Sequence, residues 1–147
     1  MVGYDVLFYS KSETGEGGVM KKYLHILVAI VSAITMITGL VQIVLPGFIL
    51  KIVGAQITPT SMHFFSIVGM FMLLFGGLTL HAVYSAVPSR VAVLWSMFQK
   101  FGASAAVGIG IFNGIFSSLA AVVAGFDFLS AILLLLYLKM LKSDETG

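Results

Sequence analysis

Two opposite charges, Lys100 and Asp127, lie in the middle of the most apolar half of this 147-residue chain. The dipeptide Asn113-Gly114, a strong turn signal, stands between them at equal distances from both. If the turn joins two antiparallel membrane helices, the ammonium and the carboxylate reach the same depth in the bilayer. An ionisable group deep in hydrocarbon is costly and is normally paired or functional. We therefore expect Lys100 and Asp127 to form an intramembrane charge pair.

The expected pair has three interpretations. In the first, the two charges neutralise each other and fix the register of two helices. In the second, Asp127 takes up and releases a proton or a cation, and Lys100 tunes its affinity for that ion. In the third, the pair meets a partner subunit or a second copy of the chain.

A stripe of polar side chains follows the first apolar segment at helical spacing. It consists of Ser32, Thr35, Thr38 and Gln42. In the structural interpretation these groups bond to carbonyl oxygens of their own helix or to neighbouring helices, at ~0.6–2 kcal/mol per contact. In the functional interpretation they line, together with Gln99, a narrow polar cavity that faces the charge pair.

His25 and His81 are expected near one membrane surface, at a similar depth on adjacent helices. Two histidines at one level can be axial haem ligands, so haem b or a metal is an alternative interpretation. The simpler interpretation is a pair of interfacial histidines close to Lys21 and Lys22, and we expect no cofactor and no metal site. The aromatic residues Tyr23, Tyr84, Trp95 and Tyr137 are interpreted as anchors at the membrane surfaces.

Motifs of common enzymes are missing from the sequence. It contains no G-x-x-x-x-G-K-[ST], no H-E-x-x-H and no G-x-S-x-G, so we assign no catalytic residue and expect no enzyme. It also has no cysteine, which excludes disulfides and thiolate chemistry.

The composition is that of a membrane protein. Hydrophobic residues make up 59% of the chain and charged residues 10%, against about 25% charged residues in soluble domains. The chain contains four apolar stretches of about 20 residues or more. Each of them is long enough to cross ~30 Å of hydrocarbon at 1.5 Å per residue. The sequence predicts an all-α membrane protein of four transmembrane helices in an up-down-up-down bundle, forming one domain over residues 20–147. The helices are predicted over 23–44, 61–85, 89–112 and 117–141.

Small residues at helical spacing predict where these helices pack. Ser66, Gly69, Gly76 and Gly77 are interpreted as a packing surface of the second helix, with a hinge as the alternative. For the third and fourth helices the predicted contact joins two sets of small residues, Gly102, Ala106 and Gly110 with Ala120, Ala124 and Ala131.

Basic residues near the ends of the helices predict the orientation. One side holds Lys21, Lys22, Arg90, Lys139 and Lys142, and the other holds only Lys51. Because cytoplasmic flanks are enriched in Lys and Arg, both termini are expected in the cytoplasm, in a multi-pass protein of a bacterial inner membrane. The expected partner is the lipid bilayer, and no basic face indicates nucleic acid.

The first 19 residues are polar and are predicted to be a disordered tail. Alternatively they are not translated and the protein begins at Met20. Glu16-Gly17-Gly18 can be encoded by a purine run like those of bacterial ribosome-binding sites.

Several landmarks occur in a characteristic order. Gly39 precedes Pro46-Gly47, the second helix is rich in glycine, Trp95 precedes Gln99-Lys100, and Asp127 lies in the fourth helix. In this layout the stretch 23–141 resembles the small four-helix bacterial membrane proteins of the DoxX-like group. The resemblance implies a four-helix membrane fold and, for some members, a link to quinone-dependent redox or oxidative-stress systems.

The sequence thus favours a non-enzymatic accessory or structural component of a membrane complex or homo-oligomer. The alternative is a small transporter or an ion- or proton-conducting subunit that uses Lys100 and Asp127. A further alternative is a redox subunit associated with haem or quinone.

Overall fold

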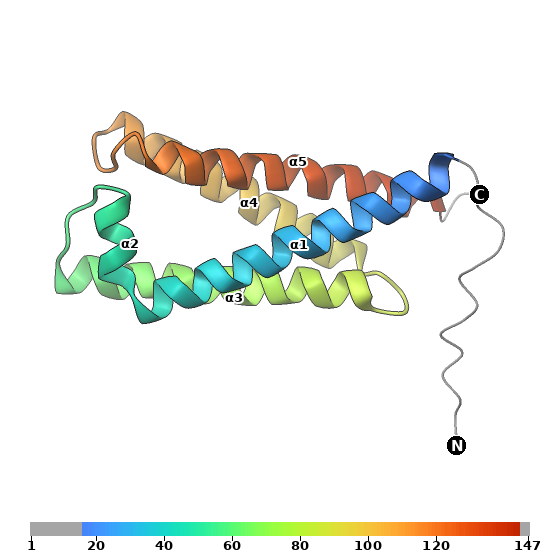
Figure 1. The fold of residues 1–147 in the computed structure, drawn as a ribbon, viewed down its shortest axis with the longest axis horizontal. Coiled ribbons are helices and arrows are strands. Elements are labelled where there is room, and N and C mark those ends of the chain that lie inside the picture. Colours follow the sequence, from blue (N-terminus) through green and yellow to red (C-terminus); the bar gives the residue numbers. More distant parts are fainter. Residues whose placement is uncertain (1–15, 145–147) are drawn as a thin grey trace, which may run out of the picture.

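The structure, a computed structural model, describes residues 16–144 as helices joined by short connections (Figure 1). The helices are α1 (Glu16–Val44), α2 (Pro46–Ile52), α3 (Pro59–Tyr84), α4 (Arg90–Phe112) and α5 (Ala120–Asp144). The predicted all-α class is confirmed for the described residues. Most of the predicted polar tail, residues 1–15, lies outside them, whereas residues 16–19 form the start of α1.

Three helices of the described chain are long and apolar enough to cross a membrane. They are Gly18–Val44, Pro59–Tyr84 and Ala120–Lys142, within α1, α3 and α5. Helix α4 has 23 residues, which is sufficient length, but Gln99 and Lys100 at its middle lower its apolar character. The structure therefore supports a multi-pass membrane protein, and a fourth span remains a prediction.

The first apolar helix ends at Val44, as predicted, but the Pro46-Gly47 stop also begins a new helix. Pro46 occupies the first turn of α2, where a proline loses no helical hydrogen bond. Helix α2 is therefore a short separate helix, and its Leu50 is buried.

The predicted turn at Asn113-Gly114 is confirmed. Asn113 caps α4, and Gly114 has a φ of +70°, in the left-handed region that glycine adopts without strain. The amide of Ile115 donates to the Gly110 carbonyl (2.8 Å) and that of Gly114 to the Ile111 carbonyl (3.0 Å), which is a Schellman ending.

Helix α5 begins at Ala120, three residues later than predicted at 117. The amide of Ser117 donates to the Val53 carbonyl at 2.8 Å, so the turn is tied to the end of α2 before α5 starts. The local sequence does not predict this hydrogen bond, because Ser117 and Val53 are far apart in the chain.

The long helices form two antiparallel hairpins, α1 with α3 and α4 with α5 (Figure 1). In the first hairpin the backbones touch. A Cβ atom added at Gly39 would lie 2.6 Å from the Gly69 carbonyl oxygen, and one added at Gly76 would lie 2.9 Å from the Ser32 carbonyl oxygen. Gly69 and Gly76 therefore form the predicted packing surface, whereas Gly77 meets only Met36, at 3.8 Å.

The second hairpin packs only partly as the sequence predicts: Ala120 and Ala131 of α5 are buried, but the small residues of α4 do not form the contact. Ala106 is exposed, and a Cβ atom added at Gly102 would meet nothing within 4 Å. Gly110 packs against the ring of Phe116 instead of α5. The buried face of α4 carries Val93, Ser96, Met97 and Lys100. Small residues permit a close approach of helices in lipid but do not impose one. On the α4 side, Lys100 pairs with Asp127 and the Phe101 ring meets that of Phe128.

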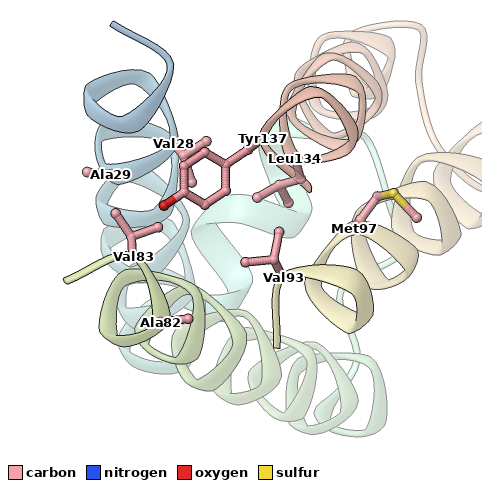
Figure 2. Packing of buried hydrophobic residues seen from close by; sticks show 8 residues of the cluster. All are labelled: Val28, Ala29, Ala82, Val83, Val93, Met97, Leu134 and Tyr137. Carbon is pink, nitrogen blue, oxygen red and sulfur yellow. The ribbon is translucent and has the colours of Figure 1, made fainter. Parts of the chain in front are cut away.

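An apolar core fills one end of the bundle, where α1 begins and α5 approaches its end (Figure 2). Its side chains come from all four long helices and include Val28, Val83, Val93 and Leu134. Tyr137 lies at its centre and is 1% exposed, so the predicted role of Tyr137 as a surface anchor is wrong. The ring lies against α1, with Tyr137 Oη 3.4 Å from His25 Nδ1, and belongs to the cluster that includes Val83 of α3 and Val93 of α4.

Basic residues concentrate at the same end of the bundle. The start of α1, the α3–α4 connection and the end of α5 lie together, and α2 lies at the opposite end (Figure 1). This end therefore carries Lys21, Lys22, Arg90, Lys139 and Lys142, and Lys51 is at the other. Between the ends, large apolar side chains such as Phe64, Phe71 and Leu129 are exposed, as on a surface that faces lipid.

Candidate functional site

The central feature of the interior is an ion pair between α4 and α5. Lys100 Nζ donates a hydrogen bond to Asp127 Oδ1 at 2.6 Å, and each residue is 4% exposed. The two helices are antiparallel and the residues are equidistant from the turn, so the side chains meet at one depth. Each charge is compensated within a single chain.

The ammonium of Lys100 has a second favourable neighbour. Its Nζ atom lies 5.3 Å from the centre of the Phe126 ring, a cation–π distance. Removing one partner from a buried pair leaves the other uncompensated, which destabilises proteins by about 3–5 kcal/mol. The pair therefore has the geometry to lock the register of α4 against α5.

A small cavity lies next to Lys100, between the two hairpins. Its polar lining comes from α1, α3 and α4 and consists of Ser32, Thr35, Thr79, Ser96, Gln99 and Lys100. Phe75 and Leu134 contribute apolar walls. The space is sufficient for about one water molecule.

The predicted cavity-lining residues divide into two groups. Ser32, Thr35 and Gln99 line the cavity, and Thr38 and Gln42 lie elsewhere. Relative to Thr35, Thr38 is rotated by about 60° around the helix axis, and Gln42 lies about 10 Å further along that axis. Gln42 is 5% exposed and packs beside Gly69, where its Oε1 has no hydrogen-bond partner within the described residues.

The hydroxyl groups of α1 bond to their own helix. Ser32 Oγ donates to the Val28 carbonyl (2.8 Å), Thr35 Oγ1 to that of Val31 (2.9 Å) and Thr38 Oγ1 to that of Ile34 (2.8 Å). This is the back-bonding of the structural interpretation. It also means that Ser32 and Thr35 present lone pairs, not protons, to the cavity.

Thr79 and Ser96 connect the two hairpins. Thr79 Oγ1 lies 2.7 Å from Ser96 Oγ and 2.8 Å from the Phe75 carbonyl oxygen. With one proton on each hydroxyl, Thr79 donates to Phe75 and accepts from Ser96. Sequence reasoning missed Thr79, although a threonine within an apolar helix was an available signal.

The two histidines have different surroundings. His25 Nδ1 lies 3.4 Å from Tyr137 Oη, and the imidazole ring also contacts Tyr84 edge-on, with ring centres 5.5 Å apart. His81 is exposed. Within the described part of the chain, no ring contact or hydrogen bond joins His25 to His81. No cluster of three or more His, Asp or Glu side chains among these residues could hold a metal ion.

Comparisons with protein families, with curated proteins and with solved structures found no match for this chain. The resemblance to DoxX-like proteins stays a prediction from the residues.

Proposed function

We propose that the chain is a small integral membrane protein whose four long helices all span a bacterial inner membrane. The support for α4 as the fourth span is the inward position of its polar groups. Ser96 and Lys100 are buried, whereas exposed positions of α4 such as Trp95, Phe98 and Phe112 are apolar. The concentration of basic residues at one end supports a cytoplasmic location for the start of α1 and the end of α5.

Within that membrane, the protein acts as a non-enzymatic accessory or structural component of a complex or a homo-oligomer. The observation that carries this proposal is the compensated pair of Lys100 and Asp127, with its 2.6 Å hydrogen bond. The described mid-membrane charges are thereby satisfied within the chain, and the neighbouring hydroxyls bond to helix carbonyls or to each other. An interior of this kind holds the helices in one arrangement, so the outer surface of the bundle keeps one shape that partner proteins can bind.

The second candidate is an ion- or proton-conducting subunit. One observation favours it: the cavity adjoins the ammonium of Lys100 and takes its polar lining from three helices. In this function Asp127 would exchange an ion and the cavity would be part of its path.

Reconstitution distinguishes the two functions. We expect purified protein in liposomes to show no proton flux above that of empty liposomes, and to be recovered from detergent as a homo-oligomer or with a stoichiometric partner. A proton flux that is lost in Asp127→Asn would show conduction instead of a structural role. The control is Gly102→Ala, which adds a methyl group in open space on the same hairpin and should keep that flux. A monomer without a partner or flux would contradict both.

The same preparation tests the redox alternative. A Soret absorption band that disappears in His81→Ala and persists in His63→Ala would identify haem binding and overturn the proposal.

A further inference from the structure

The cavity beside Lys100 has an unbalanced set of hydrogen-bonding groups. Ser32 and Thr35 donate their protons to backbone carbonyls, so only their lone pairs are available to the cavity. Gln99 Oε1 is buried and has no partner within the described residues. On the other side, the ammonium of Lys100 carries three protons, of which Asp127 takes one.

A group that fills this cavity must both accept and donate hydrogen bonds. A cation would be repelled by the ammonium of Lys100, and an anion would face the lone pairs of Ser32, Thr35 and Gln99. A neutral molecule with two donors and two acceptors fits both sides. The space, sufficient for about one water molecule, limits the occupant to that size.

We propose that this cavity is the binding site of a single structural water molecule. The water accepts a hydrogen bond from Lys100 Nζ and donates to Gln99 Oε1, and its second proton is directed to a hydroxyl oxygen of α1. The water thereby satisfies Gln99 Oε1, whose burial without a hydrogen-bond partner is unfavourable. Buried waters in proteins typically make about three such hydrogen bonds.

The water has two consequences for the molecule. It links α1 to α4, and thus one hairpin to the other, next to the direct contact between Thr79 and Ser96. It also hydrates a buried ion pair at mid-membrane depth, which gives Lys100 a neighbour for proton exchange. Both consequences hold whether the protein is structural or conducting, so the inference does not rest on the proposed function.

Solid-state NMR on the full chain in lipid bilayers tests the site. The protein is labelled with ¹⁵N-lysine, and magnetisation is transferred from water to the lysine ammonium groups. The other lysines within the described residues lie near helix ends, so Lys100 is the one at mid-span. We expect transfer from water to the Lys100 signal in the unaltered protein. A Lys100 signal without transfer would show that the cavity is dry and would overturn the inference.

Variants locate the water. Ser32→Val places additional methyl groups in the cavity and is expected to reduce the transfer severalfold. Thr38→Val is the matched control, because its hydroxyl makes the same type of backbone bond on the same helix but does not line the cavity. Gln99→Met, which removes the unpartnered oxygen, provides the same test if Ser32→Val does not fold. Unchanged transfer in the cavity variant, or an equal reduction in Thr38→Val, would place the water elsewhere and refute the assignment.

Discussion

The two hairpins of this protein both contain glycines in their helices, but they hold together in different ways. In the α1–α3 hairpin, Gly39 and Gly69 allow backbone contact, since a Cβ atom on either would lie within 2.7 Å of the other's carbonyl oxygen. In the α4–α5 hairpin, a Cβ atom on Gly102 or Gly125 would meet nothing within 4 Å. That hairpin is joined through Lys100 and Asp127.

The difference shows two solutions to one physical problem. Lipid chains are as apolar as the helices, so burial from water does not drive helices together within a membrane. Association then depends on close van der Waals contact or on polar bonds between helices. The first hairpin uses close contact and the second a buried ion pair, so the presence of glycines in both hairpins does not imply equal packing.

The largest expected effect comes from breaking the ion pair. Lys100→Met or Asp127→Ala alone should lower the free energy of unfolding in detergent by about 3–5 kcal/mol, because a buried charge loses its partner. The double variant Lys100→Met/Asp127→Ala should recover part of the loss. Additive losses in this double-mutant cycle would contradict an energetic coupling across the α4–α5 hairpin.

An intermediate effect is expected at the glycine contact of the other hairpin. In Gly39→Ala the new Cβ atom would lie 2.6 Å from the Gly69 carbonyl oxygen and 2.7 Å from the Leu73 amide nitrogen. Backbone atoms cannot move aside easily, so we expect a loss of about 1–3 kcal/mol in unfolding experiments. Gly77→Ala is the control, because its Cβ would only reach Met36 Cε at 3.8 Å. If Gly39→Ala and Gly77→Ala changed the unfolding free energy by the same amount, close backbone contact would not be the basis of this hairpin.

The hydroxyl contact between the hairpins should have a smaller effect. Thr79→Val keeps the shape of the side chain but removes its bond to Ser96, at a cost of about 0.6–1.7 kcal/mol in unfolding free energy. Thr38→Val, whose hydroxyl bonds only within α1, should be closer to neutral. If adding Ser96→Ala to Thr79→Val caused a further full loss, the two hydroxyls would not be coupled.

The smallest effect is expected at the open glycines of the second hairpin. Gly102→Ala adds a methyl group in free space and favours the helical backbone, so stability should rise by up to about 1 kcal/mol. The thermal unfolding midpoint in detergent measures this change. A clear destabilisation would show that Gly102 packs closely after all and that the two hairpins are alike.

Much of the fold was predictable because its signals are local. Pro46 marks the end of the first apolar helix, and Gly114 provides the left-handed residue of the turn that brings Lys100 opposite Asp127. The back-bonding of Ser32 and Thr35 also follows from residue type, since a hydroxyl within a helix reaches the carbonyl four residues earlier.

Other features depend on contacts between distant segments. The face of α4 that meets α5 is rotated away from Gly102 and Ala106, and helical periodicity alone does not select among adjacent faces. The contact of Tyr137 with His25 requires α5 to lie against α1 at one particular rotation. The start of α5 at Ala120 reflects a hydrogen bond between Ser117 and Val53, far apart in the chain.

The sequence by itself determined that the protein is helical and apolar enough for a membrane. It also determined that two opposite charges lie at equal distances from a turn. Hydropathy, turn chemistry and the need of backbone groups for internal hydrogen bonds in lipid act within short segments. Only the tertiary structure decided which side chains share the cavity and which glycines touch a neighbouring helix. The rotation of each helix about its axis is set by the packing of all four long helices together, which no single segment encodes.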